Sequence, residues 1–172
     1  MKKFFAILAL MLAFCVNTTE AAIPKSEMSL GGVRTGVNIS QVYKTYGKPA
    51  RKETKTAYMW GGNMQFVTYY FGNGSFYVTE VKGGNKNFGV LITATTSNNG
   101  IKTPAGIAVG DSATKLKTKY GNPDSVENTS EGTLYIYSAI QTKRFDTMDE
   151  LQIVIKNGKI IKITLEDGIL ST

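Results

Sequence analysis

One stretch of the sequence occurs twice, at residues 32–49 and again at residues 106–123. The copies are offset by 74 positions (106 − 32), and both keep two glycines, a Tyr-Gly pair and a proline in register. Self-similarity at a fixed period indicates a duplicated supersecondary unit. We therefore predict two tandem units, over residues 23–98 and 99–172. A unit of this size would be marginally stable alone, so the two are expected to share one hydrophobic core.

Residues 1–22 have the composition of a secretory signal peptide. Two lysines precede an apolar run that is too short to span a bilayer, and small residues follow at Ala21 and Ala22. We expect cleavage near Ala22 and a protein exported to the periplasm or outside the cell, with no transmembrane segment in the mature chain. Lipidation at Cys15 is the rival interpretation, but the bulky Phe14 lies where such signals carry a small residue.

Each copy of the repeat has the pattern of a short amphipathic helix. In the first copy Asn38 can cap the helix, Gln41 can complete a capping box, and apolar residues follow at helical spacing. In the second copy Ser112 or Asp111 is the expected cap. A glycine followed by a proline ends both helices, because glycine favours the C-terminal turn and proline cannot continue it.

The sequence after each helix predicts antiparallel strands, because apolar and polar residues alternate there. The expected strands are 57–61, 64–71, 75–82 and 89–96 in the first unit, and 133–140, 150–156 and 159–166 in the second. Asn-Gly pairs at 73–74 and 157–158 are typical of two-residue hairpins. The predicted fold class is α+β: two tandem repeats of a short helix plus an antiparallel β-meander, with the helices on one face of a continuous sheet.

Alignment of the two Asn-Gly pairs assigns strand residues to the two faces of this sheet. On the core face of the second unit it places Leu151, Ile153, Ile155, Ile161, Ile163 and Leu165. On the core face of the first unit it places Val67, Tyr69, Phe71, Tyr77 and Val81. Seven aromatic residues then face the other way and form our candidate partner-binding site: Tyr58, Trp60, Phe66, Tyr70, Phe76, Tyr135 and Tyr137.

Aromatic side chains gathered on an uncovered sheet face are typical of an interaction surface. The alternative is structural, because strands favour aromatic residues and cross-strand aromatic pairs stabilise a sheet without any partner.

The residue types present argue against catalysis and metal binding. The chain contains no histidine, and its single cysteine, Cys15, lies in the expected signal peptide. The commonest general base, the thiol nucleophile and most zinc ligands are therefore missing from the expected mature protein. Asp146, Asp149 and Glu150 lack the spacing of a calcium loop, and we interpret them as a solvated acidic loop. We predict no enzyme activity, no catalytic residues, no metal site and no cofactor.

The chain carries a formal net charge of +7, but its lysines and arginines are scattered along the sequence. No concentrated basic motif of a nucleic-acid-binding protein is present. Because export also separates the protein from nucleic acid, we expect weak attraction to acidic proteins or anionic envelope polymers instead.

Two motifs resemble those of the small SmpA/OmlA (BamE-type) outer-membrane assembly proteins. One is the glycine-led helix at 36–42 with its Tyr-Gly-Lys-Pro stop at 46–49, and the other is the strand, Asn-Gly and return strand at 151–160. Two such units in tandem resemble the architecture of β-lactamase inhibitor protein (BLIP). That resemblance implies that the open sheet face grips a partner protein with its aromatic residues. The chain departs from the inhibitor in having no disulfides, and from the assembly lipoproteins in lacking a convincing lipid-attachment site.

The sequence therefore predicts an exported, non-enzymatic interaction module that binds another envelope or secreted macromolecule through an aromatic sheet face. The alternative is an envelope module that binds a polysaccharide or small ligand, with the same rings as stacking platforms.

Overall fold

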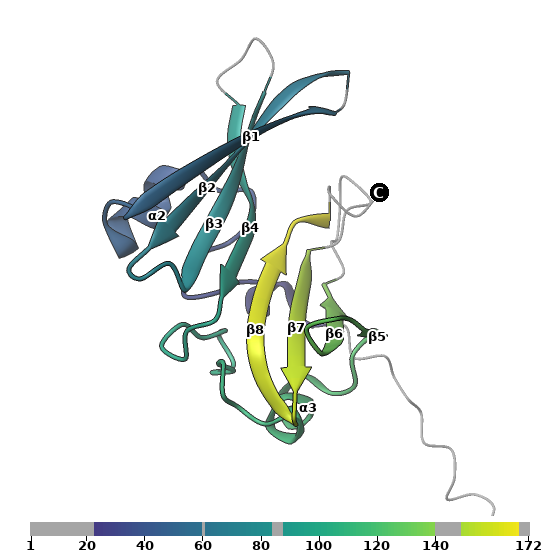
Figure 1. The fold of residues 1–172 in the computed structure, drawn as a ribbon. Coiled ribbons are helices and arrows are strands. Elements are labelled where there is room, and N and C mark those ends of the chain that lie inside the picture. The colour runs from purple at the N-terminus through teal and green to yellow at the C-terminus, as the bar shows by residue number, and fades with distance from the viewer. Residues whose placement is uncertain (1–22, 60, 84–87, 140–148, 169–172) are drawn as a thin grey trace, which may run out of the picture.

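The computed structural model describes residues 23–59, 61–83, 88–139 and 149–168. These residues form a single eight-stranded antiparallel sheet and two α-helices (Figure 1). The strand order is β1-β2-β3-β4-β8-β7-β6-β5, so each strand pairs with its neighbour in sequence except where β4 meets β8. The predicted α+β class and the antiparallel meander are confirmed.

The elements follow one another along the chain as η1 (Lys25–Glu27), α2 (Ile39–Tyr46), β1 (Arg51–Met59), β2 (Gly62–Phe71), β3 (Phe76–Gly83), β4 (Phe88–Thr96), α3 (Ala113–Tyr120), β5 (Ser125–Asn128), β6 (Thr133–Ser138), β7 (Glu150–Lys156) and β8 (Lys159–Glu166). β1 begins well before the predicted 57–61, and β5 was not predicted. The expected signal peptide lies outside the described residues. Among the described residues, no helix has the length and apolar character needed to cross a membrane.

Both α-helices begin at a side-chain cap, as predicted. Asn38 Oδ1 accepts a hydrogen bond from the amide of Ser40 at 2.9 Å, in place of the expected box with Gln41. Ser112, rather than Asp111, caps α3, and its Oγ accepts from the amide of Lys115 at 3.1 Å. Each bond satisfies an amide that the first helical turn leaves unpaired.

Gly47 and Gly121 end the two helices with φ angles of 74° and 77°. A positive φ strains every residue that has a Cβ atom, so the glycines fix where both helices stop. The apolar side chains of the helices then enter one hydrophobic cluster, in which Val42 of α2 is 1% exposed and Leu116 of α3 is fully buried. Strand residues of this cluster include Val67, Tyr69, Phe71, Val78, Ala94, Leu151, Ile153, Ile163 and Leu165.

Residues 23–37 connect the two halves of the sheet. The amide of Gly36 donates to the carbonyl of Leu91 at 2.7 Å, and the amide of Leu91 donates to the carbonyl of Val37 at 2.9 Å. On the other half, Thr35 Oγ1 donates to Asp149 Oδ1 at 2.9 Å. The segment therefore bonds both to β4 and to the residue that precedes β7.

The face assignment was transferred from β8 to β3 through the two Asn-Gly pairs, and it was wrong for β3 because it took Ile161, the counterpart of Tyr77, as a core residue. The pair at 73–74 joins the second and third strands after α2, whereas the pair at 157–158 joins the third and fourth strands after α3. β2 and β3 pair without a register shift, from Phe71 opposite Phe76 onward. Phe76 and Val78 therefore lie on the core face, and Tyr77 lies on the opposite face.

The β7–β8 ladder differs from the β2–β3 ladder because it contains a register shift next to Ile155. An extra residue in one strand reverses which side chains face the core beyond it. Ile160 is therefore buried beside the turn and Ile163 and Leu165 are buried beyond the shift, while Ile161 is only half-buried. The predicted core position of Ile161 was wrong, and those of Ile163 and Leu165 were right.

Candidate functional site

One face of the sheet contributes little to the hydrophobic cluster, and we call it the outer face. Strand register places on it a row of side chains in which each residue is the cross-strand partner of the next, from one edge of the sheet to the other: Arg51, Tyr70, Tyr77, Thr95, Thr164, Gln152, Ile136 and Ser125. Cross-strand neighbours on one face are close enough to interact. With strands about 4.8 Å apart, the row is about 34 Å long.

The β1–β3 end of the row is aromatic and charged. The rings of Tyr70 and Tyr77 have their centroids 5.3 Å apart and are tilted by 40°. The guanidinium carbon of Arg51 lies 3.9 Å from the centroid of the Tyr70 ring, a cation–π geometry. Glu53 accepts a hydrogen bond from the Tyr70 hydroxyl at 2.8 Å and forms an ion pair with Arg51. These contacts fix the Tyr70 ring through its face and through its hydroxyl.

Threonine hydroxyls occupy the middle of the outer face. Thr68 Oγ1 and Thr79 Oγ1 lie 3.1 Å apart, and Thr95 Oγ1 and Thr164 Oγ1 lie 3.2 Å apart across the β4–β8 junction. A hydroxyl both donates and accepts, so the half-buried Thr68 and Thr79 retain hydrogen-bonding capacity toward a ligand, whereas Thr95 is only 4% exposed.

Beyond the threonines, two carboxylates lie opposite each other on β7 and β8. Glu150 and Glu166 are cross-strand partners, and Gln152 Nε2 donates to both, at 3.0 Å and 2.8 Å. Burial and the charge of Glu150 raise the pKa of the Glu166 carboxyl, and the bond from Gln152 only partly offsets this rise.

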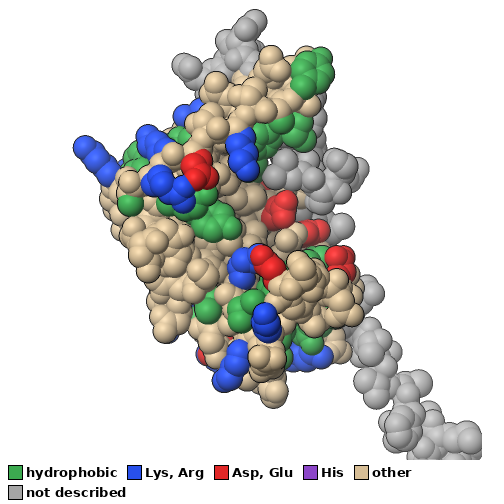
Figure 2. All heavy atoms as spheres, in the orientation of Figure 1, with side chains coloured by type: hydrophobic (Ala, Val, Ile, Leu, Met, Phe, Trp, Pro, Cys, Tyr) green, Lys and Arg blue, Asp and Glu red, His purple; other side chains and the backbone are tan. Residues whose placement is uncertain are grey.

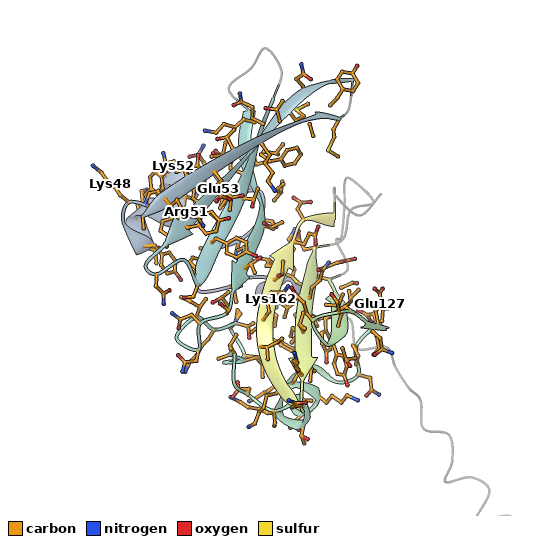
Figure 3. All side chains as sticks on the ribbon, in the orientation of Figure 1. Lys48, Arg51, Lys52, Glu53, Glu127 and Lys162 are labelled. Carbon is orange, nitrogen blue, oxygen red and sulfur yellow. The ribbon has the colours of Figure 1, made fainter. Side chains whose placement is uncertain are left out.

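A hollow of about 240 Å³ lies at the β6–β8 end of the outer face. Leu134 and Val154 supply apolar walls, Gln152 and Thr164 supply polar ones, and Lys162 forms an ion pair with Glu131 beside them. Figure 2 shows hydrophobic, basic and acidic side chains interspersed on the visible face of the molecule, and Figure 3 places Lys162 on β8. The hollow is large enough for one or two side chains of a partner.

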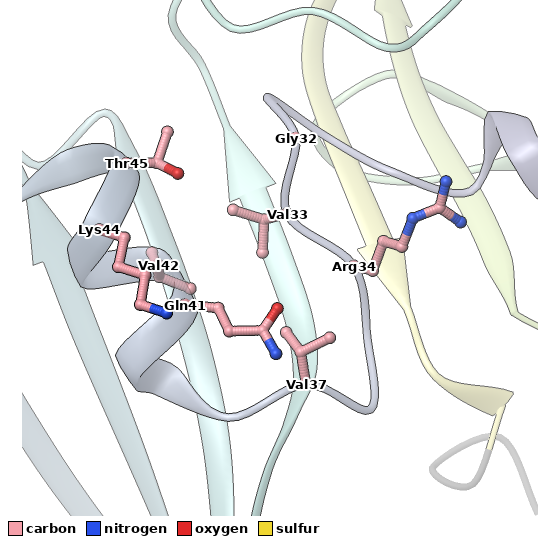
Figure 4. Close-up of a pocket in the computed structure, with 8 residues that line it drawn as sticks. All are labelled: Gly32, Val33, Arg34, Val37, Gln41, Val42, Lys44 and Thr45. Atoms are coloured by element: carbon pink, nitrogen blue, oxygen red, sulfur yellow. The ribbon is translucent and has the colours of Figure 1, made fainter.

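A second hollow, of about 410 Å³, lies between the segment 32–37 and α2. Figure 4 shows Val33, Val37 and Val42 around it, with the Gln41 amide alongside, while the guanidinium of Arg34 points away. Binding pockets usually combine an apolar lining with several converging polar groups. Polar side chains of Gln41, Lys44 and Thr45 also line this hollow, but it involves a single helix and one loop, whereas the outer face extends across all eight strands, so we take the outer face as the candidate site.

Phe66 and Tyr70 lie on the outer face, as predicted, and both are half-buried. Tyr58 is 74% exposed, but it pairs with Asn63 and so belongs to the same pleated face as Val67. Its exposure arises on the other side of the sheet from Tyr70. Trp60 lies outside the described residues.

Three of the predicted site residues lie on the core face, which corrects their assignment. Phe76 is 3% exposed and Tyr137 is fully buried. Tyr135 and Tyr137 pair with Ile153 and Leu151, both fully buried, and Tyr135 packs against the hydrophobic cluster. Burial also raises the pKa of the Tyr137 phenol, which donates to the carbonyl of Gly121 at 3.3 Å. These three rings hold the sheet to the rest of the core instead of facing a partner.

The sequence-based assignment missed Tyr77, Arg51 and Glu53. Tyr77 was assigned to the core because its counterpart in β8, Ile161, was taken as a core residue. Arg51 and Glu53 precede the strand that was predicted at 57–61. Their spacing of two places both on one face of β1, but this could be inferred only once they were known to lie in a strand.

The described residues contain no group of three or more Asp, Glu, His or Cys side chains that could hold a metal ion. Asp149 is buried and bonded to Thr35, so within the described part of the chain it is tied into the fold. Comparisons with protein-family models, with curated proteins and with solved structures found no match to this chain. The function of this chain is therefore inferred from the geometry of the outer face.

Proposed function

We propose that this chain is an exported, non-enzymatic module that binds another envelope or secreted protein through the outer face of its sheet. The observation that carries this proposal is the row that crosses all eight strands, with Arg51, Tyr70 and Tyr77 at one end and the hollow beside Lys162 toward the other. Tyrosine and arginine are enriched at the centres of protein interfaces, because they combine large contact areas with hydrogen bonding.

The geometry of the tyrosines supports a protein partner over the polysaccharide alternative. Sugar stacking needs an open ring face, and Arg51 already covers one face of the Tyr70 ring at 3.9 Å. The 40° tilt between Tyr70 and Tyr77 also prevents the two rings from forming one flat platform. A partner protein can contribute apolar side chains to the hollow and polar groups to the half-buried hydroxyls of Thr68, Thr79 and Thr164.

Two tandem units, over residues 23–98 and 99–172, are part of the same proposal. Four strands follow each α-helix, and the last strand of each set lies at the centre of the sheet. The local bonding supports the equivalence: Gly36 and Val37 bond to Leu91 on β4, as Gly110 and Asp111 bond to Ile160 on β8. A register shift follows Leu91 and Ile160 in their ladders.

The position of the helices supports an architecture of the β-lactamase inhibitor kind, with both helices on one face. Val42 of α2 and Leu116 of α3 share a single cluster with core-face residues such as Tyr69 and Ile153. Such an arrangement leaves the outer face to a partner.

The test is a comparison of proteins captured from the cell envelope and the culture medium by the wild-type chain and by outer-face variants. Tyr70→Ala with Tyr77→Ala removes the aromatic end of the row, and Leu134→Asp places a charge in the hollow. Tyr58→Ala is the matched control, because it removes an exposed tyrosine from the other face.

We expect the wild-type chain and the Tyr58→Ala control to capture a protein that neither outer-face variant captures. The same protein is expected to cross-link to a photoreactive residue placed at Thr79. A partner retained by both outer-face variants, or capture of polysaccharide without protein, would contradict the proposal.

A further inference from the structure

The two edges of the sheet differ in length and regularity. β5, at one edge, contains only the four residues Ser125–Asn128. β1, at the other, contains the nine residues Arg51–Met59, and all nine pair with β2 without a register shift (Figure 1). Proteins commonly protect edge strands by shortening them or by adding a bulge, a proline or a cover. β5 is shortened, whereas β1 has neither a bulge nor a proline, and no described strand pairs with its second side.

The charge along β1 is strongly positive. Arg51, Lys52 and Lys55 are exposed on β1, and Lys48 is exposed three residues before it; Figure 3 labels Lys48, Arg51 and Lys52 beside Glu53. Glu53 is the single acidic residue of β1, and it is already engaged by Arg51 and the Tyr70 hydroxyl. The other cations are available to a partner.

These cations lie on both faces of the strand. Arg51 is above the Tyr70 ring on the outer face, and Lys55 shares that face because the two are separated by an even number of residues. Lys52 lies on the opposite face, where its Nζ is 5.1 Å from the centroid of the Tyr69 ring. A strand added beside β1 would therefore meet a positive charge on either of its own faces.

We propose that β1 accepts an extended, acidic segment of a partner protein as a ninth strand of the sheet. The unpaired backbone groups of an edge strand supply the affinity of strand addition, and side chains on alternate faces supply its specificity. Opposite charges on cross-strand pairs stabilise the pairing and like charges destabilise it. The lysines of β1 thus select glutamate- or aspartate-rich strands and disfavour basic ones. Arg51 belongs both to this edge and to the end of the row that the proposed function uses, whereas Lys52 and Lys55 lie outside that row.

The test uses the whole chain and a fluorescent peptide, Val-Thr-Glu-Glu-Val-Glu-Thr-Val, in an anisotropy titration. Lys52→Glu with Lys55→Glu is expected to weaken binding at least tenfold. The matched control is Lys119→Glu with Lys156→Glu, which changes the net charge equally at exposed positions on α3 and β7 and is expected to change affinity less than twofold. Tyr77→Ala is also expected to change it less than twofold, so failure here is separable from failure of the proposed function.

Two measurements distinguish strand addition from general charge attraction. A peptide of the same charge with every second amide N-methylated is expected to lose binding at least tenfold, because it cannot complete the ladder. Amides of β1 that face away from β2 are expected to exchange more slowly in the complex. Absence of binding, equal binding of the methylated peptide, or equal loss in the control variant would each overturn the proposal.

Discussion

The hydroxyl of Tyr120 donates a hydrogen bond to Glu27 Oε2 at 2.9 Å, although 93 residues separate them in the chain. The amide of Ala105 donates to the same carboxylate oxygen at 2.8 Å, and Thr103 Oγ1 lies 2.7 Å from the Tyr120 hydroxyl oxygen. Burial, together with the nearby Glu27, raises the pKa of the Tyr120 phenol. The last residue of α3 is thus fixed to the short turn η1 near the start of the described chain.

Tyr120→Phe is expected to lower the free energy of unfolding by about 1–3 kcal/mol, because a hydrogen bond to a charged group is lost within a largely buried site. Urea denaturation measures the free energy of unfolding, and we expect the m-value to be the same in the variant and the wild-type chain. Tyr43→Phe is the control, since the described structure gives the Tyr43 hydroxyl no hydrogen bond, and its effect should be within about 0.5 kcal/mol. Equal losses in the two variants would show that the Glu27 contact adds nothing.

Tyr137→Ala is expected to destabilise the fold by about 3–5 kcal/mol, because it leaves a cavity where a fully buried ring packs 5.7 Å from Tyr120. Tyr77→Ala, on the outer face, should cost about 1 kcal/mol, mainly from its contact with Tyr70. Thermal or urea denaturation of the two variants tests the corrected face assignment. A larger loss of stability for Tyr77→Ala than for Tyr137→Ala would support the sequence-based assignment, in which Tyr77 faces the core, and contradict the corrected one.

Glu166→Gln is expected to stabilise the protein at neutral pH and to flatten its pH dependence. The folded-state pKa of Glu166 is raised, so between the unfolded pKa and the folded pKa the native state binds more protons. Stability therefore falls as pH rises through that window, and it is recovered as pH falls. A glutamine keeps an acceptor for Gln152 and removes the repulsion from Glu150.

The measurement is the free energy of unfolding of the Glu166→Gln variant from slightly acidic to neutral pH. The exposed Glu127→Gln is the control for the loss of one negative charge. A variant that is less stable than the wild-type chain at neutral pH would contradict the inferred repulsion.

Gly158→Ala is expected to cost about 1–2 kcal/mol, because φ at this position is 71° and a Cβ atom strains a left-handed backbone. Gly62→Ala is the matched control: its φ is ordinary and an added Cβ would meet no atom within 4 Å. Denaturation curves of the two variants provide the comparison. A loss at Gly62 as large as that at Gly158 would mean that the turn does not require the positive φ.

The helices were predictable because their signals are local. Asn38, Ser112 and the two stop glycines act within one turn of the chain, so caps and ends can be identified without knowledge of the fold. The α+β class followed from these helices and from the alternating strands between them.

The faces of the strands depended on information that a single strand does not carry. In β6, Leu134, Tyr135, Ile136 and Tyr137 are all apolar or aromatic, so alternation cannot say which pair is buried. The face that each residue of β3 occupies depends on the register of the β2–β3 ladder, which has no extra residue. The β7–β8 ladder does have one, so the faces of β8 could not be transferred to β3.

The start of β1 was predicted six residues too far along the chain, at residue 57 in place of Arg51, for a related reason. Residues 51–56 are charged or threonine, and every one is exposed, so no apolar alternation marks the strand. Their strand conformation is imposed by pairing with β2 along all nine residues. Arg51 and Glu53 therefore entered the candidate site only once that pairing was known.

β4 has a further consequence for the order in which the chain folds during its synthesis. Residues 36–37 bond to Leu91, the amide of Asp167 donates to the carbonyl of Ile92 at 2.8 Å, and β8 pairs with Thr93–Thr96. The strand at the centre of the sheet thus needs partners from both ends of the described chain. A ribosome makes β8 after every other described strand, so the side of β4 that pairs with β8 stays open until Glu166 has been synthesised. Contacts between segments so far apart in the sequence form slowly, so we expect the complete sheet to form late in folding.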